Sequence, residues 1–305
     1  MTHPDPIANS STAPEGLLRQ QARITLRLLG SLLLGGVAVV GSIALFRQGL
    51  LPLIDMVFQP GSESLSAIRR TGMVLAALGG YWAFVHWHEK REAIELKLRP
   101  VSLMLAAAGG AVLMVLPISM LFALGAYEMV NYRGFSSSLV GVAVLIGIAA
   151  LLEELVYRLL LFRLLERAWG TGIALAVSSA IFAVAHMENV ENSGAFTVVA
   201  MLVSVTMAGL VWGLVFVLTR NLWAATANHA AWNFTILLSG VPLSGIESWR
   251  DVALLESRYA GPDWLTGGMF GPECSALVLV SNAIAIALLL WWARRRGAIE
   301  ARAAY

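Results

Sequence analysis

The chain has 305 residues, of which 58% are hydrophobic and only 13% are charged. Soluble domains carry about 25% charged residues, so this composition excludes an ordinary soluble protein and indicates an integral membrane protein. The net charge of +2 gives no reason to expect nucleic-acid binding. The single cysteine, Cys274, excludes an intrachain disulfide and a cysteine-rich zinc site.

Taken in chain order, the sequence predicts two tails around one membrane domain. Residues 1–20 are polar and contain prolines, which predicts a disordered cytoplasmic tail. Residues 21–296 are expected to form a single transmembrane domain, and residues 297–305 a second cytoplasmic tail. About 20 apolar residues cross a bilayer as a helix. The predicted fold is therefore all-α, a polytopic membrane helix bundle with about eight transmembrane helices, at roughly 25–46, 71–88, 101–124, 139–162, 172–190, 195–218, 222–240 and 275–293.

The basic residues between these spans predict the orientation. With the N-terminus in the cytosol, 15 Lys and Arg residues fall on the inner side and 6 on the outer side. This asymmetry is the one expected of cytoplasmic loops, and an even number of spans brings both termini to the cytosol. The longest loop, about 241–273, is then expected to lie at the outer interface or to cap the protein.

The span at 139–162 contains two adjacent carboxylates, Glu153 and Glu154, with Arg158 one turn later. A charged side chain at the centre of a membrane helix costs about 2.5–3.5 kcal/mol on insertion scales. Glu154 and Arg158 are spaced for an ion pair on one helix face. Glu153 lies about 100° around the helix, so we expect it to remain free for chemistry.

Two further spans place polar side chains inside the membrane. Phe182 and His186 are four residues apart, as are His229 and Asn233. Buried polar groups need partners, so we expect the polar faces of these three helices to meet in one cavity. One feature opposes this arrangement: counted from the predicted span ends, Glu153 and His186 differ in depth by roughly 10 Å.

Such a cavity can support hydrolysis. A carboxylate can take a proton from water, a histidine can assist, and Asn and His side chains can hydrogen-bond a developing oxyanion. Two histidines and a glutamate can instead hold a zinc ion, so the residues permit either mechanism. Each residue also has a purely structural interpretation, such as an ion pair or a hydrogen bond between helices. A proton-coupled transporter and a non-catalytic immunity or scaffold protein are the alternative functions.

Two other patterns are interpreted as structural. His88 and Glu89 resemble the start of a HExxH zinc motif, but Glu92 stands where the second histidine belongs. We therefore expect the histidines of this region to be interfacial. Gly209 and Gly213 form a GxxxG pattern, which indicates close packing between helices.

The polar motifs resemble those of the CaaX protease and bacteriocin-processing family (CPBP), also called the abortive-infection family. EELVYR, from Glu153 to Arg158, matches its EExxxR motif, FAVAH matches FxxxH, and HAAWN matches HxxxN. All three occur in the family's order, each on a predicted span, within a core of about 139–238. The resemblance implies an intramembrane endopeptidase that acts on a membrane-anchored protein or peptide, and the small net charge predicts no nucleic-acid partner.

The resemblance also implies roles for the residues. Glu153 would be the general base, His186 would share the water, and His229 and Asn233 would support the oxyanion. Glu154, Arg158 and Phe182 would be supporting residues. We favour a glutamic mechanism that needs no cofactor, while a zinc ion, if bound, would use Glu153, His186 and His229. The expected location is the bacterial inner (plasma) membrane.

Overall fold

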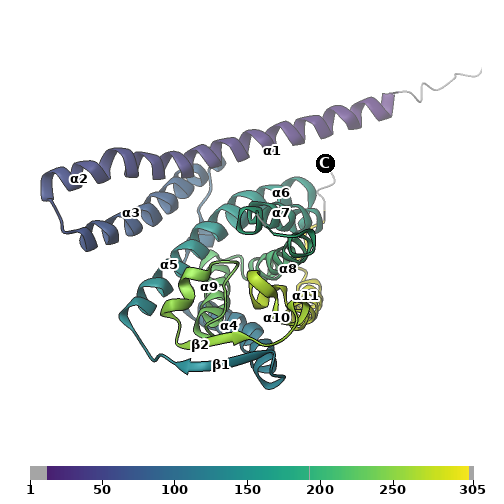
Figure 1. The fold of residues 1–305 in the computed structure, drawn as a ribbon. Helices are drawn as coiled ribbons and strands as arrows, with labels where there is room; N and C mark the ends of the chain where they lie inside the picture. The colour runs from purple at the N-terminus through teal and green to yellow at the C-terminus, as the bar shows by residue number, and fades with distance from the viewer. Residues whose placement is uncertain (1–11, 192, 302–305) are drawn as a thin grey trace, which may run out of the picture.

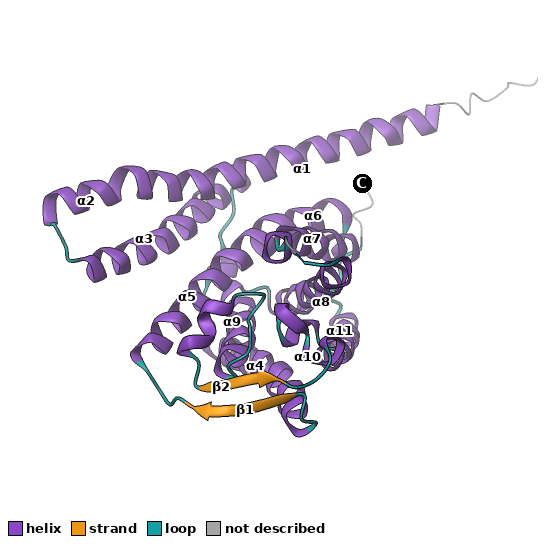
Figure 2. Cartoon of the chain, in the orientation of Figure 1, coloured by secondary structure: helices purple, strands orange, loops and turns teal. Residues whose placement is uncertain are grey.

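The computed structural model describes residues 12–191 and 193–301, and within them the chain is mostly helical (Figures 1 and 2). Five helical segments are long and apolar enough to cross a membrane: Arg19–Phe58, Pro100–Ala123, Ser137–Trp169, Ala195–Thr219 and Ala276–Arg295. They coincide with the first, third, fourth, sixth and eighth predicted spans. The chain is therefore a polytopic helical membrane protein.

The N-terminal helices form a long hairpin that extends away from the other helices (Figure 1). Its first arm is α1 (Thr12–Leu45), continued by a π-helical turn and α2 (Leu51–Phe58), and its second arm is α3 (Ser62–Ala83). The arms approach closely at Gly80, where a Cβ atom would lie 2.4 Å from the Ala38 carbonyl oxygen. Of the predicted tail at 1–20, residues 1–11 lie outside the described residues, and the rest belongs to α1.

The remaining helices form a bundle around α8 and α9. The bundle consists of α4 (Pro100–Ala123), α5 (Ser137–Glu154), α6 (Arg163–Trp169), α7 (Thr171–Ala185), α8 (Ala195–Thr219), α9 (Leu222–Leu238) and α11 (Ala276–Arg295). A π-helical segment, Leu155–Phe162, joins α5 to α6 without a break. The other predicted spans correspond to α3, to the shorter apolar helix α7 and to α9.

Two close approaches between helices depend on glycine. A Cβ atom at Gly110 of α4 would lie 2.0 Å from the backbone oxygen of Asn228 in α9, so no other residue fits there without moving a helix. A Cβ atom at Gly209 of α8 would lie 3.0 Å from the Cβ of Ser179 in α7, and one at Gly213 would lie 2.7 Å from the Leu175 side chain. The prediction that the GxxxG pattern mediates close helix packing is confirmed.

The prediction of an all-α fold is wrong in one respect. β1 (Tyr127–Tyr132) and β2 (Leu255–Tyr259) form an antiparallel pair with a bulge between Met129 and Asn131 (Figure 2). Both strands lie in segments predicted as loops. Their partners are more than a hundred residues apart in the chain, so no local sequence pattern signals the pairing.

The segment between α9 and α11 is folded against the helices. Besides β2 it contains α10 (Asp263–Thr266) and three short 3-10 helices, Glu247–Val252, Gly268–Phe270 and Pro272–Cys274. The Tyr127 hydroxyl donates to the Thr266 carbonyl at 2.5 Å, and the Ser204 hydroxyl donates to the Glu273 carbonyl at 2.6 Å. We call residues 241–275 the capping segment. Cys274 lies in it as a free, buried thiol.

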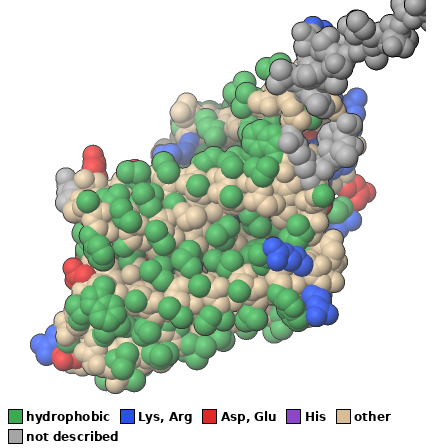
Figure 3. Space-filling view, turned by 90° about the vertical axis from the view of Figure 1, so that its right-hand side faces the viewer, with side chains coloured by type: hydrophobic (Ala, Val, Ile, Leu, Met, Phe, Trp, Pro, Cys, Tyr) green, Lys and Arg blue, Asp and Glu red, His purple; other side chains and the backbone are tan. Residues whose placement is uncertain are grey.

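Ion pairs gather at the end of the bundle where α6 meets α7. Glu89 accepts from Arg163 at 2.8 Å and from Arg167 at 2.7 Å, and Glu166 pairs with Arg220. Hydrophobic side chains are spread across the face drawn in Figure 3, and its few charged side chains lie mainly toward the margins. This distribution suits a surface that faces lipid, with charges at the two ends.

Candidate functional site

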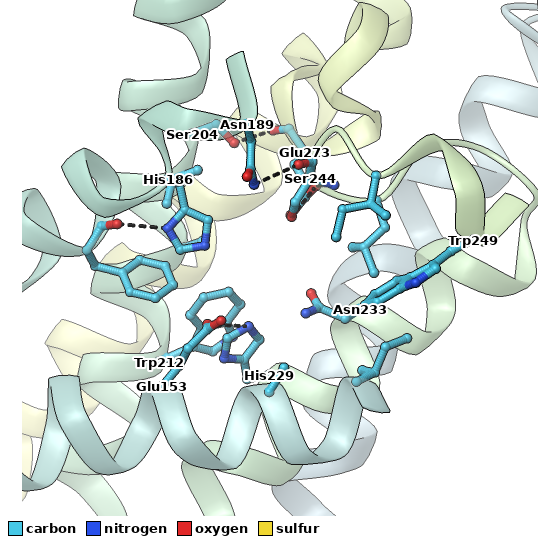
Figure 4. A pocket seen from close by; sticks show the side chains of 17 residues that line it. Glu153, His186, Asn189, Ser204, Trp212, His229, Asn233, Ser244, Trp249 and Glu273 are labelled. Carbon is cyan, nitrogen blue, oxygen red and sulfur yellow. Dashed lines mark hydrogen bonds and ion pairs between the residues drawn. The ribbon is translucent and has the colours of Figure 1, made fainter. Parts of the chain in front are cut away.

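The polar residues predicted from the sequence line one cavity of about 110 Å³ between α5, α7, α8, α9 and the capping segment (Figure 4). Glu153 enters it from α5, His186 from the end of α7, and His229 and Asn233 from α9. A space of this size, lined in part by polar side chains, has room for several water molecules. The structure therefore brings together the four residues that were predicted to act on substrate.

The predicted difference in depth between Glu153 and His186 is wrong. α5, the π-helical segment and α6 form one helical run that ends at Trp169, which places Glu153 about 24 Å from that end at about 1.5 Å per residue. His186 follows the last residue of α7, about 22 Å from the start of that helix at Thr171. The sequence predicts that the span carrying Glu153 ends at Phe162, but in the structure it continues to Trp169. Glu153 therefore lies farther from that end than predicted, at the same depth as His186.

The two adjacent glutamates occupy different environments. Glu154 is fully buried, and its Oε2 accepts from the Nε of the fully buried Arg158 at 2.9 Å. The Glu153 side chain is 33% exposed and lines the cavity. A helical turn of about 100° per residue separates the two directions. One carboxylate is thus enclosed with a counter-ion while the other meets the space where a ligand would bind.

His229 contacts both glutamates, whereas the sequence predicted Arg158 alone as the partner of Glu154. Its Nδ1 lies 3.1 Å from Oε1 of Glu154, and its Nε2 lies 3.8 Å from Oε2 of Glu153. A carboxylate can only accept, so Nδ1 donates to Glu154 and Nε2 is directed toward Glu153. The imidazole also stacks on Trp212, with ring centroids 3.5 Å apart and planes at 15°. These contacts hold the ring in one orientation.

The α9 helix that carries His229 is positioned by Asn221 at its start. The Asn221 side chain accepts from the Ala224 backbone N–H at 3.1 Å, which satisfies one of the free donors of the first turn. The same side chain donates to the Lys97 carbonyl at 2.7 Å. One residue therefore caps the helix and ties it to the loop before α4.

His186 is oriented by its own helix. Its Nδ1 donates to the Phe182 carbonyl oxygen at 2.8 Å, which leaves Nε2 for the cavity. The Phe182 ring lies beside the imidazole, with centroids 4.5 Å apart, and is packed edge-on against Tyr157 and Trp212. The guanidinium carbon of Arg158 lies 5.6 Å from the centroid of the same ring. Phe182 thus links the buried ion pair to the cavity histidine.

Several buried polar atoms near the cavity have no hydrogen-bond partner among the described residues. They include Nη1 and Nη2 of Arg158, Nε1 of Trp212 and Oδ1 of Asn233. Buried polar groups in folded proteins are nearly always hydrogen-bonded, and exceptions often have a functional reason. Asn233 lines the cavity, and a half-turn of its amide presents an N–H there instead of the oxygen.

Sequence reasoning missed the part of the cavity that the capping segment and α8 provide. Glu273, Ser244 and Trp249 line it from the capping segment, and Ser204 and Trp212 from α8 (Figure 4). Glu273 follows Pro272 in a 3-10 helix of three residues, where no helical spacing relates it to the other motifs. Trp212 looks like one more apolar residue of a span. Neither position carries a sequence signal for this cavity.

The residues present do not form a metal-binding group in this arrangement. No cluster of three or more His, Cys, Asp or Glu side chains between residues 12 and 301, residue 192 aside, is placed to hold a metal ion. This includes Glu153, His186 and His229, the ligands expected if zinc binds.

Comparison with known protein families gives a match over most of the residues that line the cavity. Residues 135–235 match the family model described as type II CAAX prenyl endopeptidase Rce1-like. The matched residues run from the start of α5 into α9 and include all three motifs. Comparison with curated proteins and with solved structures gave no match. Residues 135–235 thus form a domain of the Rce1-like family of CAAX prenyl endopeptidases.

Proposed function

We propose that this protein is an intramembrane endopeptidase that hydrolyses a peptide bond of a membrane-associated protein or peptide. The observation that carries the proposal is the contrast between two neighbouring carboxylates. Glu154 is fully buried and paired, whereas Glu153 is one-third exposed and lines a cavity with His186, His229 and Asn233. The Rce1-like family match over the same residues supports the proposal.

In the proposed reaction Glu153 acts as general base. A water molecule in the cavity gives a proton to the Glu153 carboxylate, and its oxygen attacks the carbonyl carbon of the peptide bond. The imidazole of His186, held by the Phe182 carbonyl, presents Nε2 to the same water. The product of this step is a tetrahedral intermediate whose former carbonyl oxygen carries the negative charge.

His229 and Asn233 are placed to stabilise that charge. The Asn233 amide has no partner for its oxygen among the described residues, so it is free to turn an N–H toward the intermediate. His229 is held between the two glutamates and stacked on Trp212, so no reorganisation is needed when the charge develops. The C–N bond then breaks, and the proton held by Glu153 passes to the leaving amine.

The proposed function is tested by comparing the termini of membrane proteins in cells that carry the wild type or Glu153→Gln. We expect the wild type to generate new termini that the variant does not generate, because an amide cannot accept the proton from water. Glu188→Gln is the matched control, since Glu188 is exposed and lies close to His186 in the chain. Identical termini with the wild type and Glu153→Gln would contradict the proposal.

The glutamic mechanism is a separate part of the proposal. It needs no cofactor, so cleavage by the purified protein should survive extended dialysis against a zinc chelator. Elemental analysis of the same sample should show no stoichiometric zinc. Loss of activity on chelation, with recovery on adding zinc, would contradict the glutamic mechanism but leave the proposed protease intact.

We propose the topology that the basic residues predict. In it the protein crosses a bacterial inner (plasma) membrane about eight times, with both termini in the cytosol and the capping segment on the outer side. Support comes from the ion-pair cluster near Arg163 and Arg167, which would then lie at the cytoplasmic surface. Labelling of single cysteines introduced at Glu247 and Lys97 in a Cys274→Ala background tests it. Only the first should react with an impermeant reagent applied from outside.

A further inference from the structure

The proposed reaction leaves one charged group of the cavity unused. Glu273 lies in the capping segment, is only 6% exposed and lines the same cavity as Glu153. In Figure 4 it stands with Ser244 on the side of the cavity across from Glu153 and His229. A peptide lying between these walls would therefore contact Glu153 on one side and Glu273 on the other.

Ser244 donates two hydrogen bonds that orient the Glu273 carboxyl group. The Ser244 backbone N–H donates to Oε2 at 2.7 Å, and the Ser244 hydroxyl donates to Oε1 at 3.0 Å. Ser244 adopts a left-handed backbone conformation, with φ of 50°, that aims both donors at the carboxyl group. Two donors on one carboxyl group favour its charged form and give it one direction.

The charge of Glu273 has no fixed counter-ion. None of the salt bridges found among the described residues includes Glu273. Glu154, the other deeply buried carboxylate of this region, has both Arg158 and His229. Burial without a counter-ion disfavours ionisation, and the pKa of Glu273 is accordingly raised to about 7. A positively charged group of a bound ligand would supply the missing counter-ion of the Glu273 carboxylate.

We infer that Glu273 is a specificity-determining residue that binds a basic side chain, Lys or Arg, of the peptide substrate close to the bond that is cleaved. This inference rests on the proposed function. A buried carboxylate at the base of a protease pocket selects basic side chains by the same physical principle elsewhere. The cost of burying the substrate's charge is offset because the carboxylate is already buried and already oriented by Ser244.

The inference is tested with a library of membrane-anchored peptides, randomised along the segment next to the anchor, in liposomes that contain the purified protein. The cleaved products are identified by mass spectrometry. We expect the wild type to enrich Lys or Arg at one position near the cleaved bond by about tenfold or more. Glu273→Gln keeps an acceptor for Ser244, so it should still cleave peptides with neutral residues while losing the enrichment.

Glu247→Gln is the control, because Glu247 is an exposed acidic residue of the same capping segment. It should keep the basic preference. A wild type without a basic preference, or a Glu273→Gln variant that keeps one, would overturn the inference. If Glu273 had a purely structural role, Glu273→Gln would lose cleavage of all peptides equally. That result would also overturn the inference.

Binding of methylguanidinium, measured by titration calorimetry at pH 8, separates this inference from the proposed function. We expect the inactive Glu153→Gln protein to bind this probe and the Glu153→Gln, Glu273→Gln double variant not to bind it. Equal binding by both proteins, or by neither, would overturn the inference. If Glu153→Gln still cleaves peptides, the proposed base is wrong, yet the calorimetry reports on Glu273 regardless.

Discussion

Two groups of charged residues in this protein differ in how completely they are paired. At the end of the bundle where α6 meets α7, Glu89 has Arg91, Arg163 and Arg167 around it, and Glu166 has Arg220. In the middle of the bundle, Glu153 has only His229 at 3.8 Å as an ion-pair partner among the described residues. The first group joins segments of the chain, whereas the second leaves polar atoms facing a cavity.

This difference separates a structural role from a chemical one. Each ion pair near the surface contributes little to the free energy of unfolding, but together these pairs connect segments of the chain. Unpaired polar groups in the interior cost free energy, and proteins retain them where binding or catalysis uses them. Glu154 and Arg158 combine both properties, because they pair with each other while Nη1 and Nη2 of Arg158 have no partner among the described residues.

Removing one member of the buried ion pair should have the greatest effect on stability. Glu154→Ala leaves Arg158 charged and without its carboxylate in the interior, which should cost about 3–5 kcal/mol of unfolding free energy. It should also release His229, so that cleavage is lost together with stability. Thermal unfolding in detergent measures the first effect. A Glu154→Ala protein as stable as the wild type would contradict the assignment of this pair to the structure.

The stability of the protein should depend on pH through Glu273. Burial raises its pKa to about 7 from an ordinary value of 4.5, so the folded protein holds this proton more tightly than the unfolded chain. The stabilisation is complete below the ordinary value and is lost as the pH rises through about 7, by roughly 3 kcal/mol at most. The groups that interact with Glu273 include Ser244, His229, Trp232, Cys274, Tyr127 and Tyr259.

Unfolding temperatures of the wild type and Glu273→Gln between pH 4.5 and 8 check this prediction. The difference between the two proteins should shift in favour of the variant as the pH rises, because Gln carries no charge to bury. A difference that does not change with pH would contradict the raised pKa.

Packing against α4 should determine the position of α9, the helix that carries His229. A Cβ atom at Gly110 would meet the backbone of Asn228, the residue before His229. Gly110→Ala must therefore push α4 and α9 apart, at about 1–3 kcal/mol, and displace His229. We expect the rate of cleavage to fall by more than the fraction of protein that this loss of stability unfolds. Gly141→Ala on α5 is the control, since a Cβ atom at that position would meet nothing within 4 Å.

The smallest effect is expected at the paired end of the bundle. The Arg167 side chain is 61% exposed, and Glu89 keeps Arg91 and Arg163 when Arg167 is removed. Arg167→Ala should cost no more than about 1 kcal/mol and leave cleavage unchanged. A loss comparable to that of Glu154→Ala, measured under the same conditions, would show that the two groups of charges do not differ as described.

Much of the bundle and half of the cavity follow from the sequence, because both depend on local spacing. Apolar length locates the spans, and the four-residue spacing within each motif places Glu153, His186 and His229 on inward faces. The depth of His186 relative to Glu153 could not be predicted from the sequence. It depends on where the helical run through Phe162 ends, and no local pattern marks that end. The β1–β2 pair and Glu273 do not follow either. They depend on contacts between distant segments, such as that of Ser244 with Glu273, which leave no periodic pattern.

The different roles proposed for Glu153 and Glu154 are the basis of the proposed function. Cleavage and thermal unfolding of purified Glu153→Gln, measured on one sample against the wild type, test it directly. We expect a loss of cleavage of about a hundredfold or more with an unchanged unfolding temperature. Cleavage at the wild-type rate, or a loss fully explained by unfolding, would contradict it.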